Sequence, residues 1–281
     1  MSATTSRPAE RGRGGLAQAT SDGLLVAWRN LKRIPRIPEL AIFAILQSIM
    51  FVLLFAFVFG GAIPIPGYEN VPNAYREFLM PGIFGQTIVF AAATTAIGMA
   101  DDTHKGIIDR FRSLPMARSA VLSGRALSDV VYNGGILIVL ILSGLAVGWT
   151  VHTGFPALLA GVGLMLLFAF AMSWLGIWMG LNVPSVEVAQ QVIFTVLFPI
   201  TFVSNVFVPP QTLPDWLQPV AEWNPTSTLT GALRELWGNP NPYVSESFPS
   251  QNPVLVTVVW VVVIVAIFGP LGVRRYRSMS R

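Results

Sequence analysis

The chain has 281 residues, of which 53% are hydrophobic and only 11% are charged, and its formal net charge is +4. Soluble domains usually carry about 25% charged residues, so this composition excludes a soluble globular protein and predicts an integral membrane protein. The absence of cysteine excludes disulfides, thiolate metal sites and cysteine nucleophiles. The basic residues are expected to set topology and to contact anionic headgroups of the lipid bilayer, and no nucleic acid partner is expected.

The N-terminal segment divides into two parts. Residues 1–20 are rich in Ser, Thr, Gly and Arg and lack the apolar core of a cleaved signal peptide, which predicts a disordered cytoplasmic tail. From Ser21 onward, apolar residues recur at helical spacing opposite a basic face. This pattern predicts a helix lying in the cytoplasmic interface of the membrane, ended by Pro35 and Pro38.

Long uncharged runs fill most of the remaining chain. A helix needs about 20 apolar residues to cross the hydrocarbon core. We therefore expect an all-α membrane protein with six transmembrane helices in one domain, residues 21–281. The expected spans are residues 40–62, 81–100, 130–149, 155–183, 188–208 and 254–273. Prolines in residues 64–79 predict an external loop that ends in a short helix before the second span.

The distribution of basic residues predicts the orientation of the chain. All Lys and Arg residues except Arg76 and Arg234 lie in residues 1–38, 101–128 and 274–281. Six spans place these three segments on one side of the membrane, and the positive-inside rule identifies that side as the cytoplasm. Both termini are therefore expected to be cytoplasmic.

Residues 101–125 form the largest charged segment between two long uncharged runs. Read as a helix from about Thr103 to Pro115, the segment has one apolar and one charged face. The apolar face consists of Ile107, Ile108, Phe111 and Leu114. Such a helix can press its apolar side into a neighbouring protein. The alternative is a solvated loop that only obeys the topology rules.

The external segment 209–253 holds nine of the 21 prolines and three tryptophans. Within it, Asn224 is a helix cap followed by Pro225 at the first helical position, and leucines follow at helical spacing. We expect short re-entrant helices that dip into the outer leaflet. The alternative is an ordinary interfacial loop anchored by tryptophan.

Three strings and the order of these elements resemble the type-2 ABC exporter permeases, in particular their daunorubicin/doxorubicin-resistance branch. The strings are AWRNLKRIPRIPEL before the first span, YREFLMPGIFGQT leading into the second, and DDTHKGIIDRFRSLPMARSAVLSGR after it. The resemblance covers the chain from about Ser21. One departure is that the acidic-Arg start of the third pattern is replaced here by Asp101, Asp102, Thr103 and His104.

The resemblance implies a coupling helix, seated in a groove of a separate ATPase subunit, in an assembly of two permeases and two ATPases. It assigns ATPase coupling to Lys105, Gly106, Arg110, Phe111, Leu114 and Pro115. The second permease is either another copy of this chain or a sister permease. A phosphate-binding loop needs Gly-Lys-Ser/Thr, but the only lysines are Lys32 and Lys105, after Leu31 and His104. This chain is therefore expected to bind no cofactor, with ATP and Mg held by the partner ATPase.

Polar side chains inside the spans are candidates for a substrate path or a dimer seam, because each is costly in lipid. On the second span the candidates are Gln86, Thr87, Thr94 and Thr95. On the fifth span they are Gln190, Gln191, Phe194, Phe198, Phe202 and Asn205. For the two glutamines, hydrogen bonds between helices at a dimer seam are an equal alternative. For the phenylalanines, core packing is the alternative to contact with a flat apolar substrate.

The expected function is the membrane permease subunit of an ATP-driven exporter of amphiphilic drugs, metabolites or lipids in a bacterial plasma membrane. One alternative is a polysaccharide or glycolipid exporter of the same architecture. Another is a stand-alone channel or intramembrane enzyme, which would need a ring of charge or a catalytic pair, and the sequence shows neither. His104 and His152 fall on opposite sides of the membrane in the expected topology, which excludes a paired-histidine metal site.

Overall fold

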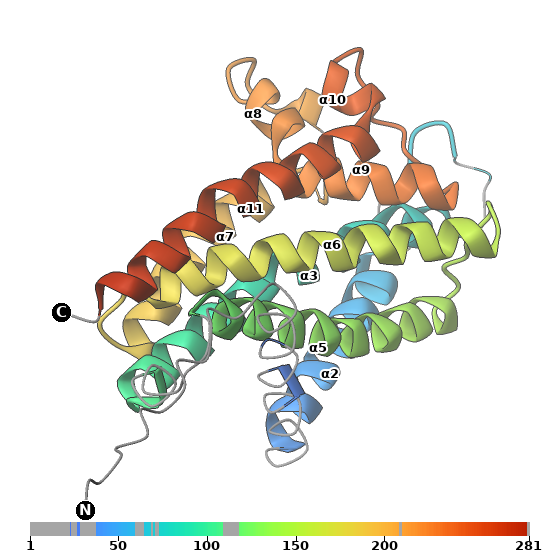
Figure 1. The fold of residues 1–281 in the computed structure, drawn as a ribbon. Coiled ribbons are helices and arrows are strands. Elements are labelled where there is room, and N and C mark those ends of the chain that lie inside the picture. The colour runs from blue at the N-terminus through green and yellow to red at the C-terminus, as the bar shows by residue number, and fades with distance from the viewer. Residues whose placement is uncertain are drawn as a thin grey trace, which may run out of the picture.

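The computed structural model describes residues 23, 27–28, 38–59, 65–68, 70, 73–108, 118–207 and 210–279, and the regular structure within them is entirely helical. The longer helices are α2 (Pro38–Leu53), the π-helix η2 (Leu54–Phe59), α3 (Ala74–His104), α5 (Arg118–Ala146), α6 (Phe155–Gly180), α7 (Val186–Phe202) and α11 (Pro253–Ser278). Between α7 and α11 lie η3 (Pro210–Thr212), α8 (Gln218–Trp223), α9 (Pro225–Trp237) and α10 (Phe248–Gln251). Figure 1 shows the long helices α5, α6 and α11 side by side, with α8, α9 and α10 gathered around the start of α11.

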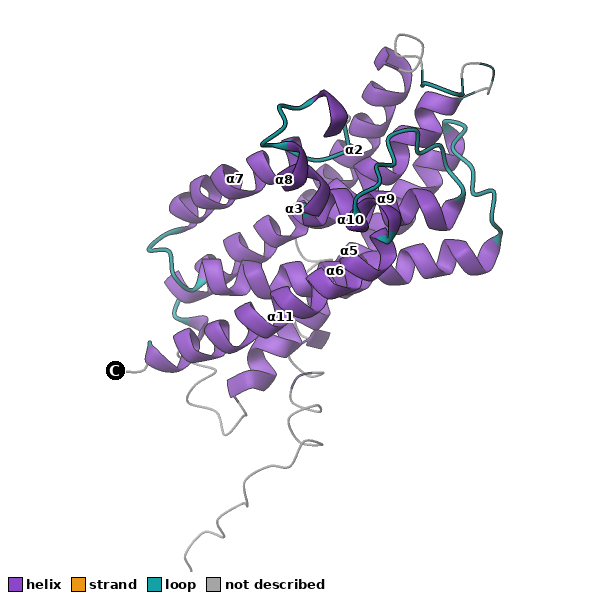
Figure 2. Cartoon of the chain, turned by 90° about the horizontal axis from the view of Figure 1, so that it is seen from above, coloured by secondary structure: helices purple, strands orange, loops and turns teal. Residues whose placement is uncertain are grey.

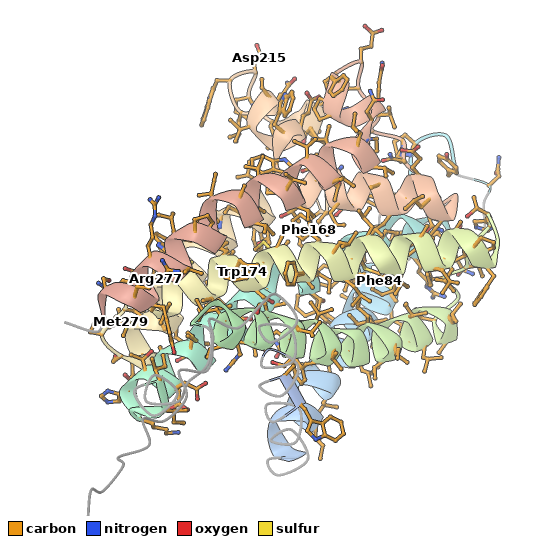
Figure 3. The ribbon with its side chains drawn as sticks, viewed as in Figure 1. Phe84, Phe168, Trp174, Asp215, Arg277 and Met279 are labelled. Atoms are coloured by element: carbon orange, nitrogen blue, oxygen red, sulfur yellow. The ribbon has the colours of Figure 1, made fainter. Side chains whose placement is uncertain are left out.

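Four helical segments are long and apolar enough to cross a membrane: α3, residues 121–146 of α5, α6 and α11. They correspond to the predicted second, third, fourth and sixth spans. The helix α7, with 17 residues, is shorter, and α2 is continued by η2 to residue 59. Asp215, just before α8, and Arg277, near the end of α11, lie far apart in the molecule (Figure 3).

The helix α3 forms the centre of the bundle. Most of its apolar stretch is buried, whereas less than half of the corresponding stretch is buried in each of the other three candidate spans. Its neighbours are α6, α7, α9 and α5, and in Figure 2 it lies among these helices. Phe84 of α3 and Phe168 of α6 are fully buried (Figure 3). Near the start of α6, Phe84 packs edge-on against Trp149 and Trp237, with ring centroids 5.2 and 6.0 Å away.

The closest helix crossing joins α3 to α6. A Cβ atom at Gly176 would stand 2.5 Å from the carbonyl oxygen of Ala92, and one at Gly180 would collide with the carbonyl oxygen of Ala96. Small residues four apart on both helices therefore bring the two backbones into contact. In a bilayer, where burial of apolar surface does not drive helices together, such packing is a main source of association.

The helix α3 extends beyond the predicted second span at both ends. The predicted external loop of residues 64–79 and the span beginning at Pro81 are not separate, because α3 starts at Ala74 and continues through Pro81. Burial of Phe78 and Leu79 in the core favours helix in this stretch despite the proline. At the other end, Thr103 belongs to α3 and does not begin a separate helix, since the chain turns at Gly106 with a positive φ of 65°.

The structure also bears on the predictions made for the helix cap, the short helices and the N-terminal segment. The predicted cap Asn224 accepts a hydrogen bond from the backbone N–H of Thr226 at 2.8 Å, with Pro225 in the first helical turn. Short helices are present in the external segment, as predicted, while their depth in a membrane stays a prediction. The tail of residues 1–20 and nearly all of the predicted interfacial helix lie outside the described residues.

We predict that Gly176→Ala destabilises the protein by about 1 to 3 kcal/mol, because the added methyl group overpacks the contact with Ala92 and Thr95. Thermal unfolding of the purified protein in detergent measures the effect. Gly163→Ala on the same helix is the matched control, since no atom lies within 4 Å of its added Cβ. Equal midpoints for the two variants would contradict the close α3–α6 contact.

Candidate functional site

The helix α7 is attached to the bundle along a single narrow stripe. Its buried residues are Ala189, Ile193, Leu197 and Thr201, each four residues after the last. These pack mainly against α3. Ser185 begins the helix by accepting a hydrogen bond from the backbone N–H of Val188 at 3.3 Å. Most of the remaining surface of α7 faces away from the chain.

The sequence-predicted residues on α7 all lie on this exposed surface. Gln190 and Gln191 are exposed, and Phe194, Phe198 and Phe202 are each about half exposed, at 48%, 52% and 49%. This exposure excludes packing of the three phenylalanines in the core of this chain. The structure therefore places two amide side chains and three aromatic rings on one open helix.

A row of aromatic rings continues from α7 to the end of α2. Phe198 stacks on Phe202 at 4.2 Å between ring centroids, and Phe202 lies 5.9 Å from Phe207. Phe207 then stacks on Phe55 at 5.2 Å, which in turn contacts Phe51 at 5.1 Å. Neighbouring ring planes are tilted by 26° to 42°, and the rings form a continuous apolar row. Its residues come from α7, the segment after α7, η2 and α2.

The predicted residues on α3 do not lie together. Gln86 and Thr95 are buried, whereas Thr94 is exposed. Thr87 is partly buried and donates to the carbonyl of Ile83 at 2.8 Å. The ring of Phe90 lies 5.8 Å from that of Phe194, and Thr94 follows Phe90 by one helical turn, so this face of α3 borders the open side of α7. Thr95 faces elsewhere.

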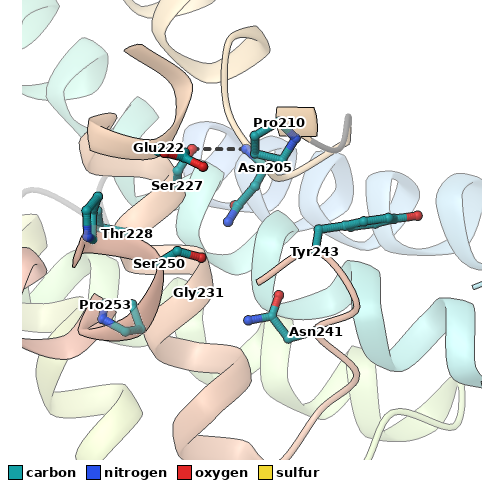
Figure 4. A pocket seen from close by; sticks show the side chains of 11 residues that line it. Asn205, Pro210, Glu222, Ser227, Thr228, Gly231, Asn241, Tyr243, Ser250 and Pro253 are labelled. Carbon is teal, nitrogen blue, oxygen red and sulfur yellow. Dashed lines mark hydrogen bonds between the residues drawn. The ribbon is translucent and has the colours of Figure 1, made fainter. Parts of the chain in front are cut away.

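Asn205 lies in a different environment from the other predicted residues of the fifth span. Its backbone N–H donates to Ser227 Oγ at 3.0 Å, and its side chain borders a small external pocket (Figure 4). This pocket holds about 20 Å³, room for about one water molecule. Other residues around it include Glu222, Asn241 and Ser250. The pocket is too small for an organic substrate.

Arg234 attaches the helix α9 to the rest of the bundle. Its side chain is completely buried, with Nε donating to the carbonyl of Phe78 at 3.0 Å and both terminal nitrogens donating to the carbonyl of Asn205 at 3.2 Å. The guanidinium also lies 3.8 Å from the centroid of the Phe78 ring. Sequence reasoning treated Arg234 only as an exception to the charge distribution, because its carbonyl partners carry no sequence signal.

His152 and Glu77 join the α5–α6 turn to α3. His152 Nε2 lies 2.9 Å from a carboxylate oxygen of the buried Glu77, and the other oxygen accepts from the hydroxyl of Thr150 at 2.8 Å. The backbone N–H of His152 also donates to the carbonyl of Trp237 at 2.9 Å. These contacts give His152 a structural role at this end of the bundle.

A set of charged residues between α3 and α5 was missed by the sequence reasoning. Arg125 NH1 lies 3.0 Å from Asp102, and Arg125 Nε lies 3.2 Å from Asp129. The hydroxyl of Thr95 donates to Asp129 at 2.7 Å. The hydroxyl group of Thr95 therefore has a hydrogen-bond partner within the chain. The spacing of Arg125 and Asp129, four apart on one helix, was the available signal.

The predicted coupling segment, residues 105–115, is described only at its beginning. Lys105 is exposed and pairs with Asp101 at 2.8 Å, and Gly106 makes the turn that ends α3. Ile108, two residues later, is buried. Arg110, Phe111, Leu114 and Pro115 lie outside the described residues.

Four apolar helices of spanning length, one of them the buried central helix α3, define a multi-pass helical membrane protein. Residues 23–236 match the family model described as ABC-2 type transporter. The chain belongs to the ABC-2 type transporter family and is a membrane permease of that kind, which confirms the resemblance found in its sequence.

Similar proteins span nearly the whole chain. The daunorubicin resistance ABC transporter permease protein DrrB1 of Streptomyces coeruleorubidus is 31% identical over 264 residues, which cover 94% of this chain and 89% of that protein. A putative transport permease, ycf38, of Cyanophora paradoxa is 23% identical over 89% of this chain and 85% of its own length. The ycf38 protein of Porphyra purpurea is 22% identical over 75% of this chain and 72% of its own length.

We predict that Arg234→Met lowers the free energy of unfolding by about 2 to 4 kcal/mol, because the buried carbonyls of Phe78 and Asn205 lose their donors. Denaturant titration of the protein in detergent measures the loss. Glu235→Gln, at the exposed neighbouring position, should leave stability unchanged. A Met variant as stable as the parent chain would show that α9 does not depend on this anchor.

Proposed function

We propose that the chain is the permease subunit of an ATP-driven exporter that moves amphiphilic drugs, metabolites or lipids out across a bacterial plasma membrane. The observation that carries this proposal is the aromatic row from Phe198 to Phe51, exposed at Phe198, Phe202 and Phe51, in a chain similar over nearly its whole length to a daunorubicin resistance permease. Flat amphiphilic ring systems stack well on such a surface.

The proposed topology has six spans with both termini in the cytoplasm. The four long apolar helices supply four of them. Together α2 and η2 cover residues 38–59, which at about 1.5 Å per residue is enough to cross the hydrocarbon core. The fifth span combines α7 with the residues that follow it to Phe207. The concentration of basic residues in segments 1–38, 101–128 and 274–281 supports the orientation.

Energy for transport is proposed to come from two copies of a separate ABC ATPase, which would hold ATP and Mg. Support comes from the family and from the absence of any Gly-Lys-Ser/Thr sequence in this chain. The ATPase would contact residues 105–115, where Phe111 and Leu114 offer an apolar face and Arg110 a charge. The remaining proposed contacts are Lys105, Gly106 and Pro115.

The open face of α7 is proposed to meet a second permease, either another copy of this chain or a sister subunit. Gln190 and Gln191 stand exposed on a mostly apolar helix. Amide groups facing lipid leave their hydrogen bonds unmade, which favours a protein neighbour at this face. The substrate path would then run between the two subunits, along the aromatic rows and Thr94.

We predict that Phe198→Ala raises the concentration of a daunorubicin-type amphiphile needed to stimulate ATP hydrolysis by about threefold to tenfold, the effect of one lost ring contact. The measurement is drug-dependent ATPase activity of the permease reconstituted in vesicles with its ATPase. Phe155→Ala, at an exposed ring on α6, is the control and should change little. Transport by the chain alone, with no ATPase present, would overturn the proposed function.

We predict that Gln191→Cys permits disulfide cross-linking between two permease subunits in membranes, because this position faces outward from α7. The chain has no native cysteine, so each single-cysteine variant reports on one position. Ala189→Cys, at a position only 2% exposed, should not cross-link. For a sister permease, the partner needs a cysteine at the matching position. Cross-linking of Ala189→Cys alone would place the seam on another face.

A further inference from the structure

The described beginning of the coupling segment, residues 105–108, follows α3, and a charged contact lies at the end of that helix. Arg125 of α5 reaches Asp102, in the last turn of α3, at 3.0 Å and Asp129, one turn further along α5, at 3.2 Å. All three side chains are only 15 to 16% exposed. Lys105 and Asp101 form a second pair at the rim, 2.8 Å apart.

One face of α3 is shaped to receive this arginine. Thr95, Gly98 and Asp102 follow one another at spacings of three and four residues and therefore share a helix face. Thr95 donates to Asp129, and Asp102 pairs with the guanidinium. A Cβ atom at Gly98 would collide with a terminal nitrogen of Arg125. Because Gly98 has no side chain, the guanidinium of Arg125 can lie against the backbone of α3 at this position.

An apolar contact holds the same region from the other side. After the turn at Gly106, Ile108 is 3% exposed and packs in a cluster with Leu122 of α5, Ile177 of α6 and Tyr276 of α11. The first residues of the coupling segment are therefore fixed to three helices. The ion pair and this cluster together leave little freedom at the base of the segment.

We propose that Arg125 is a positioning residue that clamps the base of the coupling segment, so that a push on this segment moves α3 and α5 as one unit. The inference rests on the proposed function, because it requires an ATPase that pushes. A guanidinium held by two carboxylates at fixed geometry resists sliding of the helices, and a largely buried pair is little screened by solvent. Since α3 also packs against α7, its displacement reaches the aromatic row.

Two mild variants test the clamp. Arg125→Lys keeps the charge but cannot bridge both carboxylates with a rigid fork. Gly98→Ala keeps every charge and displaces the guanidinium. Gly135→Ala on α5, where no atom lies within 4 Å of the added Cβ, is the matched control. All are reconstituted with the ATPase in vesicles, and transport per ATP hydrolysed, basal hydrolysis and subunit assembly are measured.

We expect both test variants to assemble and to hydrolyse ATP at the basal rate, while transport per ATP falls about fivefold or more. The control should match the parent chain. A reversible thiol-reactive cross-linker between Asp102→Cys and Arg125→Cys should restore transport, and reduction should abolish it again. A structural role alone would not give this reversible change in coupling.

The outcomes separate this inference from the function on which it rests. A parent complex without drug-dependent ATP hydrolysis would refute the proposed function. A parent complex that works, together with unchanged transport per ATP in Arg125→Lys and Gly98→Ala, would refute only the clamp. Loss of assembly in both variants would assign Arg125 to folding and would equally overturn the clamp.

Discussion

The close approach of α3 and α6 is the contact on which the remaining structure depends. Gly176 and Gly180 let α6 lie directly on the backbone of α3 at Ala92 and Ala96. With α6 seated this deeply, α3 becomes the buried centre and presents its other faces to α5, α7 and α9. Each of those faces carries different side chains, so the positions of the polar groups on α3 follow from its packing against α6.

Two buried arginines illustrate how α3 is tied at its two ends. Near the cytoplasmic end of the proposed topology, Arg125 pairs with carboxylates, a contact that changes with any relative movement of two helices. At the opposite end, Arg234 donates to backbone carbonyls, which stay in place whatever the neighbouring side chains do. The first arrangement suits a connection that transmits force, and the second suits a permanent attachment of α9. The sequence gives no sign of this difference.

Composition and local signals predicted the class of protein, the family resemblance and most of the long helices. The helix cap at Asn224 was also readable, because capping depends on a few adjacent residues. The extension of α3 from Pro81 back to Ala74 carries no such local signal, since it depends on burial of the residues around the proline. Thr95 was assigned to a path on its polarity alone, yet its hydroxyl is satisfied by Asp129, and such a partner depends on how two helices meet.

Because α7 is attached along a single stripe, the stability of the protein in the membrane depends on what covers its open face. A newly made copy without its neighbours exposes two glutamines on this helix to the acyl chains, where their hydrogen bonds go unmade. In the proposed assembly a second permease would cover these glutamines, so an unassembled copy would be less stable than an assembled one and would be degraded first. Such degradation would match the abundance of the chain to that of its scarcest partner subunit.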